Sequence, residues 1–505
     1  MTHKRKAIDY SRPNEPGVAF GSIGCESNDD QQVVLPVLRY SIEMRQLPRW
    51  IPGFLLVLVF VASWVDKVVA FSASASGDVT RRHWSSSQHS PSRLTSLSYR
   101  TECVKNGRQS TALSSISLTS TNESQRTLRV GILGAGAIAL ATAALLSQAG
   151  HNPMLWSPSE KSLPTDADWK VSVTGKLEFC FSPRVATSEV DLARQNEILI
   201  ICLPANGHKQ VMDSIAPYLM SEHSVIVSSH ASFGALYLSQ LLFQRGVSLP
   251  ITAWGTTVAT ARRPEKAQVR INTIRNAIDF CTIPSSYSQS SVGLCRQLFP
   301  QIGNFVERDG IVGIALSNLN PQNHLGIAIG NMSRMEKGED WYQSLHITPA
   351  IGRLLEGLDA ERLAIADACQ VRVKTIFEHF ALSFHVPQTD NISEMNQEIH
   401  RRGNDVLGPN TAESRYILED VPFGLVPTII LGRLVNKPAV LHEAGVALIS
   451  SMYGRDFMAE NDLLDALNLQ EYTLDDLVRA GETGVLAKKM DPVTKKQTVV
   501  GFMES

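Results

Sequence analysis

The sequence of 505 residues is poor in cysteine and has no large excess of charge of either sign. Its seven cysteines are scattered, without a CxxC pair or a His/Cys cluster, which argues against a disulfide framework and a zinc site and suits a reducing compartment. The formal net charge is −2, so the chain lacks the electrostatic footprint of a protein that binds nucleic acid or an anionic membrane. Internal repeats are also lacking.

Long hydrophobic runs are lacking as well. Residues 54–65 form an uncharged apolar run of twelve residues, which is short for a membrane span and typical of the central segment of a signal peptide. Arg45 and Arg49 precede this run, and small or medium residues follow it up to Ala70. Residues 71–127 are rich in Ser, Thr and Arg and poor in acid, so they cannot bury enough apolar surface to fold.

Residues 1–127 are therefore expected to be a disordered targeting presequence, with a signal-like segment at 44–70 and a transit-like segment at 71–127. This pairing resembles the bipartite presequences of algae with complex plastids, which implies delivery to a plastid with Met44 as a sufficient start. The alternative is a secretory or signal-anchored protein. The N-terminus of the protein isolated from its native cell decides, because a mature chain that retains residues 54–65 would contradict plastid delivery.

The most informative motif follows the presequence. Residues 130–133 are a short apolar run, typical of a buried parallel strand, and a glycine-rich turn and an alanine-rich helix come after it. In that turn Gly134 allows a sharp bend, Gly136 lets the backbone approach a pyrophosphate at the helix start, and Ala139 lets the helix pack close to the strand. A strand, turn and helix in this order predict a dinucleotide-binding Rossmann domain.

Alternating strands and helices continue over residues 128–306, the extent expected for this α/β domain with a parallel sheet. Further strands are expected in five segments, of which the last two are weaker candidates: 153–156, 197–204, 224–229, 251–254 and 277–283. Because ligands bind beyond the carboxyl ends of parallel strands, Pro204 and His208 are expected near the sugar and nicotinamide of the cofactor. His208, in the first turn of the next helix, either contacts the cofactor or helps to cap that turn.

The end of the second strand bears on the choice of cofactor. A carboxylate there would accept hydrogen bonds from ribose hydroxyls and repel a 2′-phosphate. This chain has Ser157 at that position, with Ser159 and Lys161 beyond it, and these side chains suit a phosphate. NADP is therefore expected to be preferred to NAD, although Glu160 could turn into the site instead.

From about residue 307 the apolar pattern changes to a period near 3.6, so residues 307–505 are expected to form an all-α domain. Asn320 is expected as the N-cap of a helix whose first residue is Pro321. Asn320, His324 and Asn331 would then share one helix face, which is either a lined cleft or a satisfied core cluster.

Residues 414–427 place three charged side chains, Arg415, Glu419 and Asp420, against a strongly apolar run. Charged groups in such surroundings cost free energy unless they are paired or used in a site. The sequence leaves open whether they form a structural ion pair or a functional cluster.

Taken together, these segments resemble the octopine/nopaline (opine) dehydrogenase family over nearly all of residues 128–470. The matching marks are the Rossmann turn, Leu203-Pro-Ala-x-x-His208, Asn320-Pro-x-x-His324 and Arg415-Tyr-x-x-Glu-Asp-Val-Pro. The resemblance implies a Rossmann domain, a following all-helical domain and an active site between them. It also implies a reversible reaction that reductively joins the amine of an amino acid to a 2-oxo acid.

The same resemblance implies roles for individual residues. His324 would be the catalytic histidine, Asp420 its orienting carboxylate and Arg415 the clamp for a substrate carboxylate, with Asn320 as a further substrate-binding candidate. The chain departs from the family at Ser157, where many members have an acid, and in residues 228–234, so the substrate preference is not implied.

Two alternatives stay open. One is an enzyme like glycerol-3-phosphate dehydrogenase or ketopantoate reductase, which relies on a lysine in the helical domain; here no lysine follows Asn320 until Lys337. The other is a non-catalytic NAD(P)-binding protein. The sequence indicates no metal and leaves the oligomeric state and both substrates open.

Overall fold

The computed structural model describes residues 126–159, 163 and 169–488. Nearly all of the expected presequence lies outside these residues, as do Glu160 and Lys161 and the last part of the expected helical domain, residues 489–505. Among the helices that are described, none has both the length and the apolarity needed to cross a membrane.

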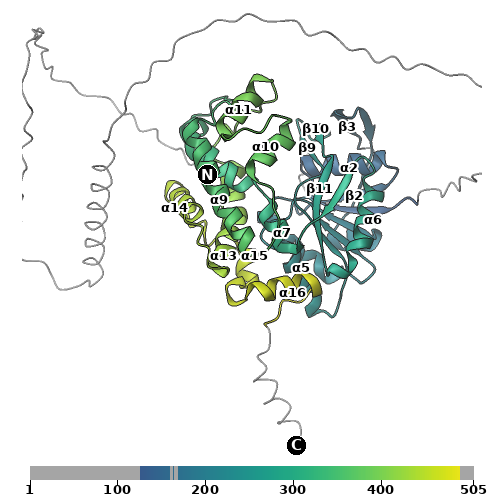
Figure 1. The fold of residues 1–505 in the computed structure, drawn as a ribbon. Helices are drawn as coiled ribbons and strands as arrows, with labels where there is room; N and C mark the ends of the chain where they lie inside the picture. Colours follow the sequence, from purple (N-terminus) through teal and green to yellow (C-terminus); the bar gives the residue numbers. More distant parts are fainter. Residues whose placement is uncertain (1–125, 160–162, 164–168, 489–505) are drawn as a thin grey trace, which may run out of the picture. The chain divides into compact units, whose positions relative to one another are not determined.

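The first half of the described chain is built on an eight-stranded sheet (Figure 1). In sheet order its strands are β12 (Asn304–Glu307), β11 (Ala277–Ile283), β8 (Ile251–Trp254), β7 (Ser224–Val227), β6 (Ile198–Ile201), β1 (Arg129–Leu133), β2 (Asn152–Trp156) and β5 (Arg184–Val185). All neighbours pair in parallel except β8 and β11, which are antiparallel. This order, with β2 and β5 on one side of β1 and β6, β7 and β8 on the other, is that of a doubly wound nucleotide-binding fold.

The two faces of this sheet are covered by different helices. Alternate residues of β6 show the pattern: Leu199 and Ile201 belong to the core cluster on the side of α3 (Glu189–Gln195), α4 (His208–Ile215) and α5 (Gly234–Gln244). Ile198 and Ile200 instead join the cluster on the side of α2 (Ala137–Gln148) and α6 (Ser288–Leu298). A strand that is apolar on both faces is typical of a parallel sheet between two helical layers.

A second sheet has four strands: β4 (Phe179–Phe181), β3 (Val171–Gly175), β10 (Gln268–Ile274) and β9 (Ala259–Arg262). Helix α2 contacts this small sheet through β9 and β10 and the main sheet through β2. Its residues from Ala139 to Leu146 are all buried, which explains why the helix is apolar on every side and rich in alanine.

Within the described residues, every element after Glu307 is helical. These elements are α7 (Gly310–Ser317), α8 (Asn320–Glu336), α9 (Pro349–Ala368), α10 (Ile376–Phe384), α11 (Ile392–Arg401), α12 (Arg415–Leu418), the π-helical turn η5 (Val421–Leu425), α13 (Val426–Leu434), α14 (Val440–Tyr453), α15 (Asp462–Leu467), the short 3-10 helix η6 (Leu469–Glu471) and α16 (Leu474–Thr483). The α/β fold followed by an all-helical part confirms the expected fold class.

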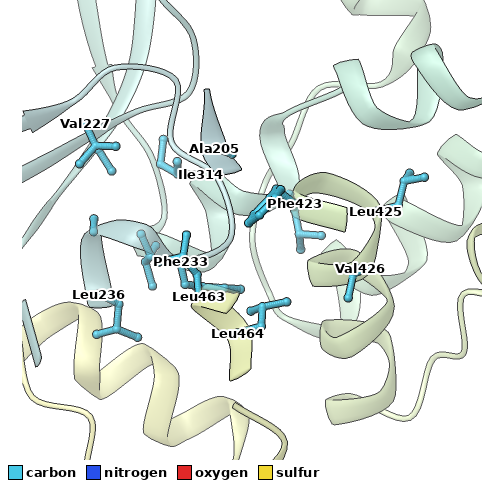
Figure 2. Close-up of a cluster of buried hydrophobic side chains, with 14 of the residues drawn as sticks. Ala205, Val227, Phe233, Leu236, Ile314, Phe423, Leu425, Val426, Leu463 and Leu464 are labelled. Carbon is cyan, nitrogen blue, oxygen red and sulfur yellow. The ribbon is translucent and has the colours of Figure 1, made fainter. Parts of the chain in front are cut away.

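The helical part returns to the sheet domain and shares a core with it. Side chains of both meet in one apolar cluster (Figure 2), which includes Ala205, Val227, Phe233 and Leu236 from the sheet domain and Ile314, Phe423, Leu425, Val426, Leu463 and Leu464 from the helices. Helix α16 also lies against the sheet domain (Figure 1), where the Gly484 carbonyl accepts hydrogen bonds from Ser239 Oγ at 2.7 Å and Gln240 Nε2 at 3.0 Å. An apolar interface of this kind holds the walls of a site between the two domains in place.

The structure also corrects the expected strands. The segment 277–283 is a strand, but it runs antiparallel to β8. The small sheet has no counterpart among the expected strands, because β3, β4 and β9 have only three to five residues and the longer β10 is mostly polar and partly exposed, without a marked apolar run.

Candidate active site

The glycine-rich turn has the geometry that a dinucleotide needs. Gly134 has φ 140°, and a Cβ on it would lie 2.3 Å from the Cys202 carbonyl oxygen, so only glycine fits there. Gly136 is the N-cap of α2, and a Cβ on it would meet nothing within 4 Å, so the space before the helix is open. Ala139 is fully buried beneath the turn. An open helix N-terminus with closely packed backbone behind it fits a pyrophosphate group.

Ser157 follows the last residue of β2 and is half-buried. Its Oγ accepts a long hydrogen bond of 3.4 Å from the backbone N–H of Ser159, which leaves the hydroxyl proton available to a ligand. Lys161, the other group expected to favour a phosphate, lies outside the described residues.

At the carboxyl end of β6 the two expected residues have different surroundings. Pro204 is exposed at the sheet edge, where a cofactor would lie. His208 begins α4 as expected, but it is fully buried, and its Nε2 lies 3.0 Å from the Leu203 carbonyl oxygen. Burial lowers the pKa of His208 to about 4, so the ring is neutral at neutral pH. Neither expected role is supported, because the enclosed ring makes no helix-capping bond and presents no surface to a cofactor.

The centre of the candidate site is a pair formed by His324 and Asp420. The His324 Nδ1 lies 2.7 Å from Asp420 Oδ2, and the two residues are only 7% and 8% exposed. A carboxylate in this position accepts the Nδ1 proton, so the neutral ring has its lone pair on Nε2. Among the described residues Nε2 has no hydrogen-bond partner, so it is free to exchange a proton with a substrate.

The pair forms because two chain segments pack unusually closely. Asp420 immediately precedes the π-helical turn η5, a type of irregularity that is frequent at functional sites. A Cβ on Gly424 in this turn would lie 2.2 Å from Cγ of Pro321, so the absence of a side chain lets η5 contact the first turn of α8. His324 follows Pro321 by one turn, and this contact therefore brings it to Asp420.

Tyr416 fixes the plane of the histidine ring. The two rings stack with their centroids 3.5 Å apart and an angle of 10° between their planes. The Tyr416 hydroxyl donates a hydrogen bond of 2.6 Å to Gln343 Oε1, and burial raises the pKa of the phenol, so it keeps its proton. Sequence reasoning gave Tyr416 no role, although it follows Arg415 directly in the motif.

Glu419 links the helical domain to the sheet edge. Its Oε1 accepts a hydrogen bond of 3.1 Å from the backbone N–H of Ala205, and burial, followed by the nearby Asp420, raises its pKa. Arg415 lies at the rim with 58% of its side chain exposed, and its Nη1 is 3.7 Å from Glu419 Oε2. Such a loose, exposed ion pair contributes little stability, which leaves the guanidinium available to a substrate carboxylate.

Asn320 is the first residue of α8, and Leu319 is the N-cap, so the helix starts one residue earlier than expected. The side chain of Asn318 caps it instead, because its Oδ1 accepts the Asn320 N–H at 3.2 Å. Asn320 lines a cavity of about 160 Å³ together with Thr256 from the sheet edge. Farther along α8, Asn331 is buried, and its side chain donates a hydrogen bond of 2.9 Å to the Ile327 carbonyl oxygen. The expected polar face of the helix therefore lines a cavity at Asn320 and is part of the satisfied core at Asn331.

The same cavity contains titratable residues that sequence reasoning missed, namely Arg275, Asp279, Lys374 and His379. They come from the β10–β11 connection, β11, the residue before the N-cap of α10 and the first turn of α10, and no shared motif marks them. In the described part of the chain, no three His, Cys, Asp or Glu side chains are grouped so that they could hold a metal ion.

Comparisons with known protein families match the two halves of the chain separately. Residues 307–453 match the model described as NAD/NADP octopine/nopaline dehydrogenase, alpha-helical domain. Residues 130–280 match the model of ketopantoate reductase PanE/ApbA.

Two similar proteins match different lengths of the chain, and one of them covers more of it than either family match. The opine dehydrogenase of Arthrobacter sp. (strain 1C) is 29% identical over 347 residues, which are 68% of this chain and 95% of that protein. The glycerol-3-phosphate dehydrogenase [NAD(P)+] of Acinetobacter baylyi is 28% identical over 97 residues, which are 19% of this chain and 27% of that protein.

Solved structures share the fold. Octopine dehydrogenase in complex with NADH and agmatine is similar with a TM-score of 0.60 at 15% identity, over 72% of this chain and 100% of that one. Yersinopine dehydrogenase is similar with a TM-score of 0.54 at 15% identity, over 70% of this chain and 99% of that one.

Proposed function

Because the chain belongs to the octopine/nopaline dehydrogenase family, we propose that it joins the amine of an amino acid to the carbonyl carbon of a 2-oxo acid and reduces the product with NAD(P)H. It is a dehydrogenase that acts on CH–NH groups. The observation that carries the proposal is the buried His324–Asp420 pair, which lies in the helical domain close to the point where Glu419 bonds the sheet edge at Ala205.

The residues at the sheet edge fit a nicotinamide dinucleotide. Gly134 and Gly136 leave the N-terminus of α2 open to a pyrophosphate, and Pro204 is exposed at the end of β6. When bound, the reduced cofactor supplies the hydride that converts a carbon–nitrogen double bond into an amine. The protein itself must bind the substrates and move protons.

Two proton transfers fit His324. An amino acid reaches the enzyme as an ammonium ion and must lose a proton before its nitrogen can attack the oxo carbon. The resulting carbinolamine must then gain a proton on its hydroxyl group, so that this group leaves as water. Nε2 of His324 can take the first proton and return it in the second step, while Asp420 stabilises the imidazolium between the two steps.

Arg415 is the proposed clamp for a substrate carboxylate. Its planar guanidinium can bind a carboxylate through two parallel hydrogen bonds, which orients the substrate as well as holding it. The exposed position at the rim and the loose contact with Glu419 support this role. Asn320, at the start of the helix that carries His324, is proposed to bind substrate as well.

The proposed activity is tested by supplying pyruvate and a panel of amino acids with NADH or NADPH. We expect the reduced cofactor to be oxidised only when both an amine and an oxo acid are present, and mass spectrometry should detect the secondary amine. Oxidation with ketopantoate or dihydroxyacetone phosphate in the absence of an amine would favour the alternative suggested by the ketopantoate reductase match, which covers only the sheet domain.

We also propose that NADPH binds more tightly than NADH, because Ser157, and not an acid, follows the end of β2. Its hydroxyl proton is available to a 2′-phosphate, and no carboxylate at this position repels one. Titration of the purified protein with each cofactor should give the lower dissociation constant for NADPH.

Ser157→Asp should reverse this order, since a carboxylate repels the 2′-phosphate and bonds the ribose hydroxyls. Ser157→Ala is the matched control: it should weaken NADPH binding slightly and leave NADH binding unchanged. Equal or tighter binding of NADH by the unmodified protein would contradict the proposal.

A further inference from the structure

The cavity next to Asn320, here called the Arg275 cavity, holds a positive charge that the protein does not balance. Arg275 lies in the connection between β10 and β11, at the edge of the main sheet where β8 ends. Its Nε is fully enclosed without a hydrogen-bond partner, and its side chain forms no ion pair with any described residue. A charged group that is partly removed from water and unpaired is costly, so such an arginine is typical of a binding site for an anion.

The neighbouring charges do not compensate Arg275. Asp279 is the carboxylate that lines the cavity, and it is already shared between Arg308 Nη2 at 2.8 Å and Lys374 Nζ at 3.3 Å. Two cations therefore face one carboxylate, and Arg275 adds a third positive charge. His379 adds none, because burial and then the charges of Arg275 and Lys374 lower its pKa to about 4.

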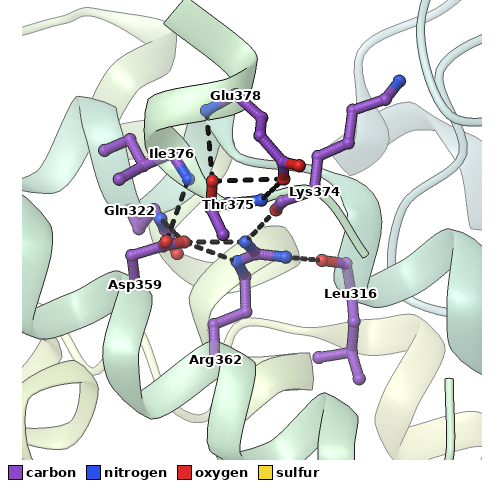
Figure 3. A network of polar contacts seen from close by, with 8 residues as sticks. All are labelled: Leu316, Gln322, Asp359, Arg362, Lys374, Thr375, Ile376 and Glu378. Atoms are coloured by element: carbon purple, nitrogen blue, oxygen red, sulfur yellow. Dashed lines mark hydrogen bonds and ion pairs between the residues drawn. The ribbon is translucent and has the colours of Figure 1, made fainter. Parts of the chain in front are cut away.

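A buried network holds the walls of the Arg275 cavity in place (Figure 3). The guanidinium of Arg362 bonds Asp359 Oδ1 at 2.7 Å and two backbone carbonyl oxygens, those of Leu316 at 2.6 Å and Lys374 at 2.5 Å. Leu316 directly precedes the segment from Ser317 to Asn320 that lines one side, and Lys374 lines the other. The cavity is thus a constructed feature with fixed walls.

The position of the cavity relative to His324 limits what can occupy it. Asn320 lies one turn before His324 on the same helix face, a separation of about 6 Å along the axis. The carboxylate next to the reacting carbon must stay beside His324, and Arg415 is its proposed clamp. A group that reaches the Arg275 cavity must therefore lie several bonds from the reacting carbon, at the far end of a substrate.

We propose that the Arg275 cavity binds a second, side-chain carboxylate of a substrate, so that the enzyme selects a dicarboxylic amino donor or a dicarboxylic oxo acid. This inference rests on the proposed function and specifies one of its substrates. The amino donor and the oxo acid would both present the same group, a side-chain carboxylate, and separate measurements show which of the two substrates carries it.

The test compares matched substrates that differ in one charge. With pyruvate fixed, glutamate is compared with glutamine; with alanine fixed, 2-oxoglutarate is compared with 2-oxopentanoate. In one of these pairs we expect kcat/KM to be at least about tenfold higher for the charged member, the usual worth of a charge-assisted hydrogen bond. Arg275→Gln should reduce the preference to about twofold or less by raising KM, and Arg275→Lys should keep part of it.

Arg270→Gln is the matched control, because Arg270 is an exposed arginine on the preceding strand β10 and should leave the preference unchanged. Cofactor affinity and melting temperature, measured for each variant, show that the fold is intact. The pair in which the preference is found identifies the substrate that carries the second carboxylate. Equal kcat/KM for the charged and the neutral member of both pairs, or a preference that survives in Arg275→Gln, would overturn the proposal. Either result would leave the proposed function in place.

A binding measurement separates the two proposals completely. Glutarate has the two carboxylates of such a substrate but no amine or oxo group, so its binding does not require turnover. Calorimetry with the cofactor-loaded protein should detect glutarate binding that Arg275→Gln weakens by about tenfold or more and Arg270→Gln does not. Glutarate that fails to bind, or that binds both variants equally, would overturn the assignment of the cavity even if the reductive condensation is found.

Discussion

Replacing His324 with alanine should lower kcat by about two to four orders of magnitude, the usual contribution of a positioned general acid–base group. The reason is that both proton transfers proposed for the reaction pass through Nε2, and no other described side chain is held by a carboxylate and stacked on an aromatic ring at this position. Steady-state kinetics with saturating substrates measures the loss. The dissociation constant of the cofactor should barely change, because His324 belongs to the helical domain.

Asp420→Asn is the companion variant. It keeps the size of the side chain but removes the charge that fixes the tautomer and stabilises the imidazolium, so kcat should fall in the same direction but less than in His324→Ala. A His324→Ala variant with nearly normal turnover would make this residue a core histidine. The 2.7 Å contact with Asp420 would then be a structural pair only.

The site between the domains has little room to open by simple separation. Phe423 and Leu425 lie three and five residues after Asp420, and both belong to the apolar cluster that contains Ala205 and Phe233 of the sheet domain (Figure 2). Ser232 Oγ also donates a hydrogen bond of 2.7 Å to the Phe423 carbonyl oxygen. The segment that carries Asp420 is therefore anchored to both domains, which is what a preorganised site requires.

Some features of the fold could be predicted because local sequence determines them. Gly134 and Gly136 mark the turn after β1, since the backbone at Gly134 requires glycine and the space at Gly136 is open to a ligand, and the apolar run of β6 marks a strand covered on both faces. The direction of β11 could not be predicted, because the sequence of a strand does not reveal the direction of its neighbour.

The candidate site shows the same limit. The contact of His324 with Asp420 joins residues that are far apart in the sequence, and it depends on the missing side chain of Gly424 against Pro321, which no periodicity indicates. His208 was placed correctly at the start of α4, but only the packing around it reveals that it faces the interior. Arg275 carried no signal at all, because its significance is the absence of a partner in three dimensions.

The largest effect on stability is expected at Arg362, the cation at the centre of the network in Figure 3. Arg362 and Asp359 are only 2% and 3% exposed, and Asp359 also accepts hydrogen bonds from Gln322 Nε2 and the Ile376 N–H, both at 2.9 Å. Arg362→Met keeps most of the volume but leaves the carboxylate buried without its cation. The free energy of unfolding should fall by about 3–5 kcal/mol.

Urea unfolding at 25 °C measures this loss, and Arg372→Met is the matched control. The Arg372 side chain is 93% exposed, with its Nε 3.7 Å from Asp309 Oδ2, so its removal should change the free energy of unfolding by about 0.5 kcal/mol or less. A loss at Arg362 no larger than that of the control would mean that water or a shift of the chain neutralises Asp359.

The double variant Arg362→Met, Asp359→Leu separates the cost of the orphaned charge from the value of the pair. Without Asp359 no charge stays buried alone, so the double variant should be more stable than Arg362→Met. It should not reach the stability of the unmodified protein, because the Gln322 side chain and the Ile376 N–H lose their acceptor, and the carbonyl oxygens of Leu316 and Lys374 lose their donor. A double variant less stable than Arg362→Met would show that these hydrogen bonds, rather than the ion pair, hold α9 to the segments that line the Arg275 cavity.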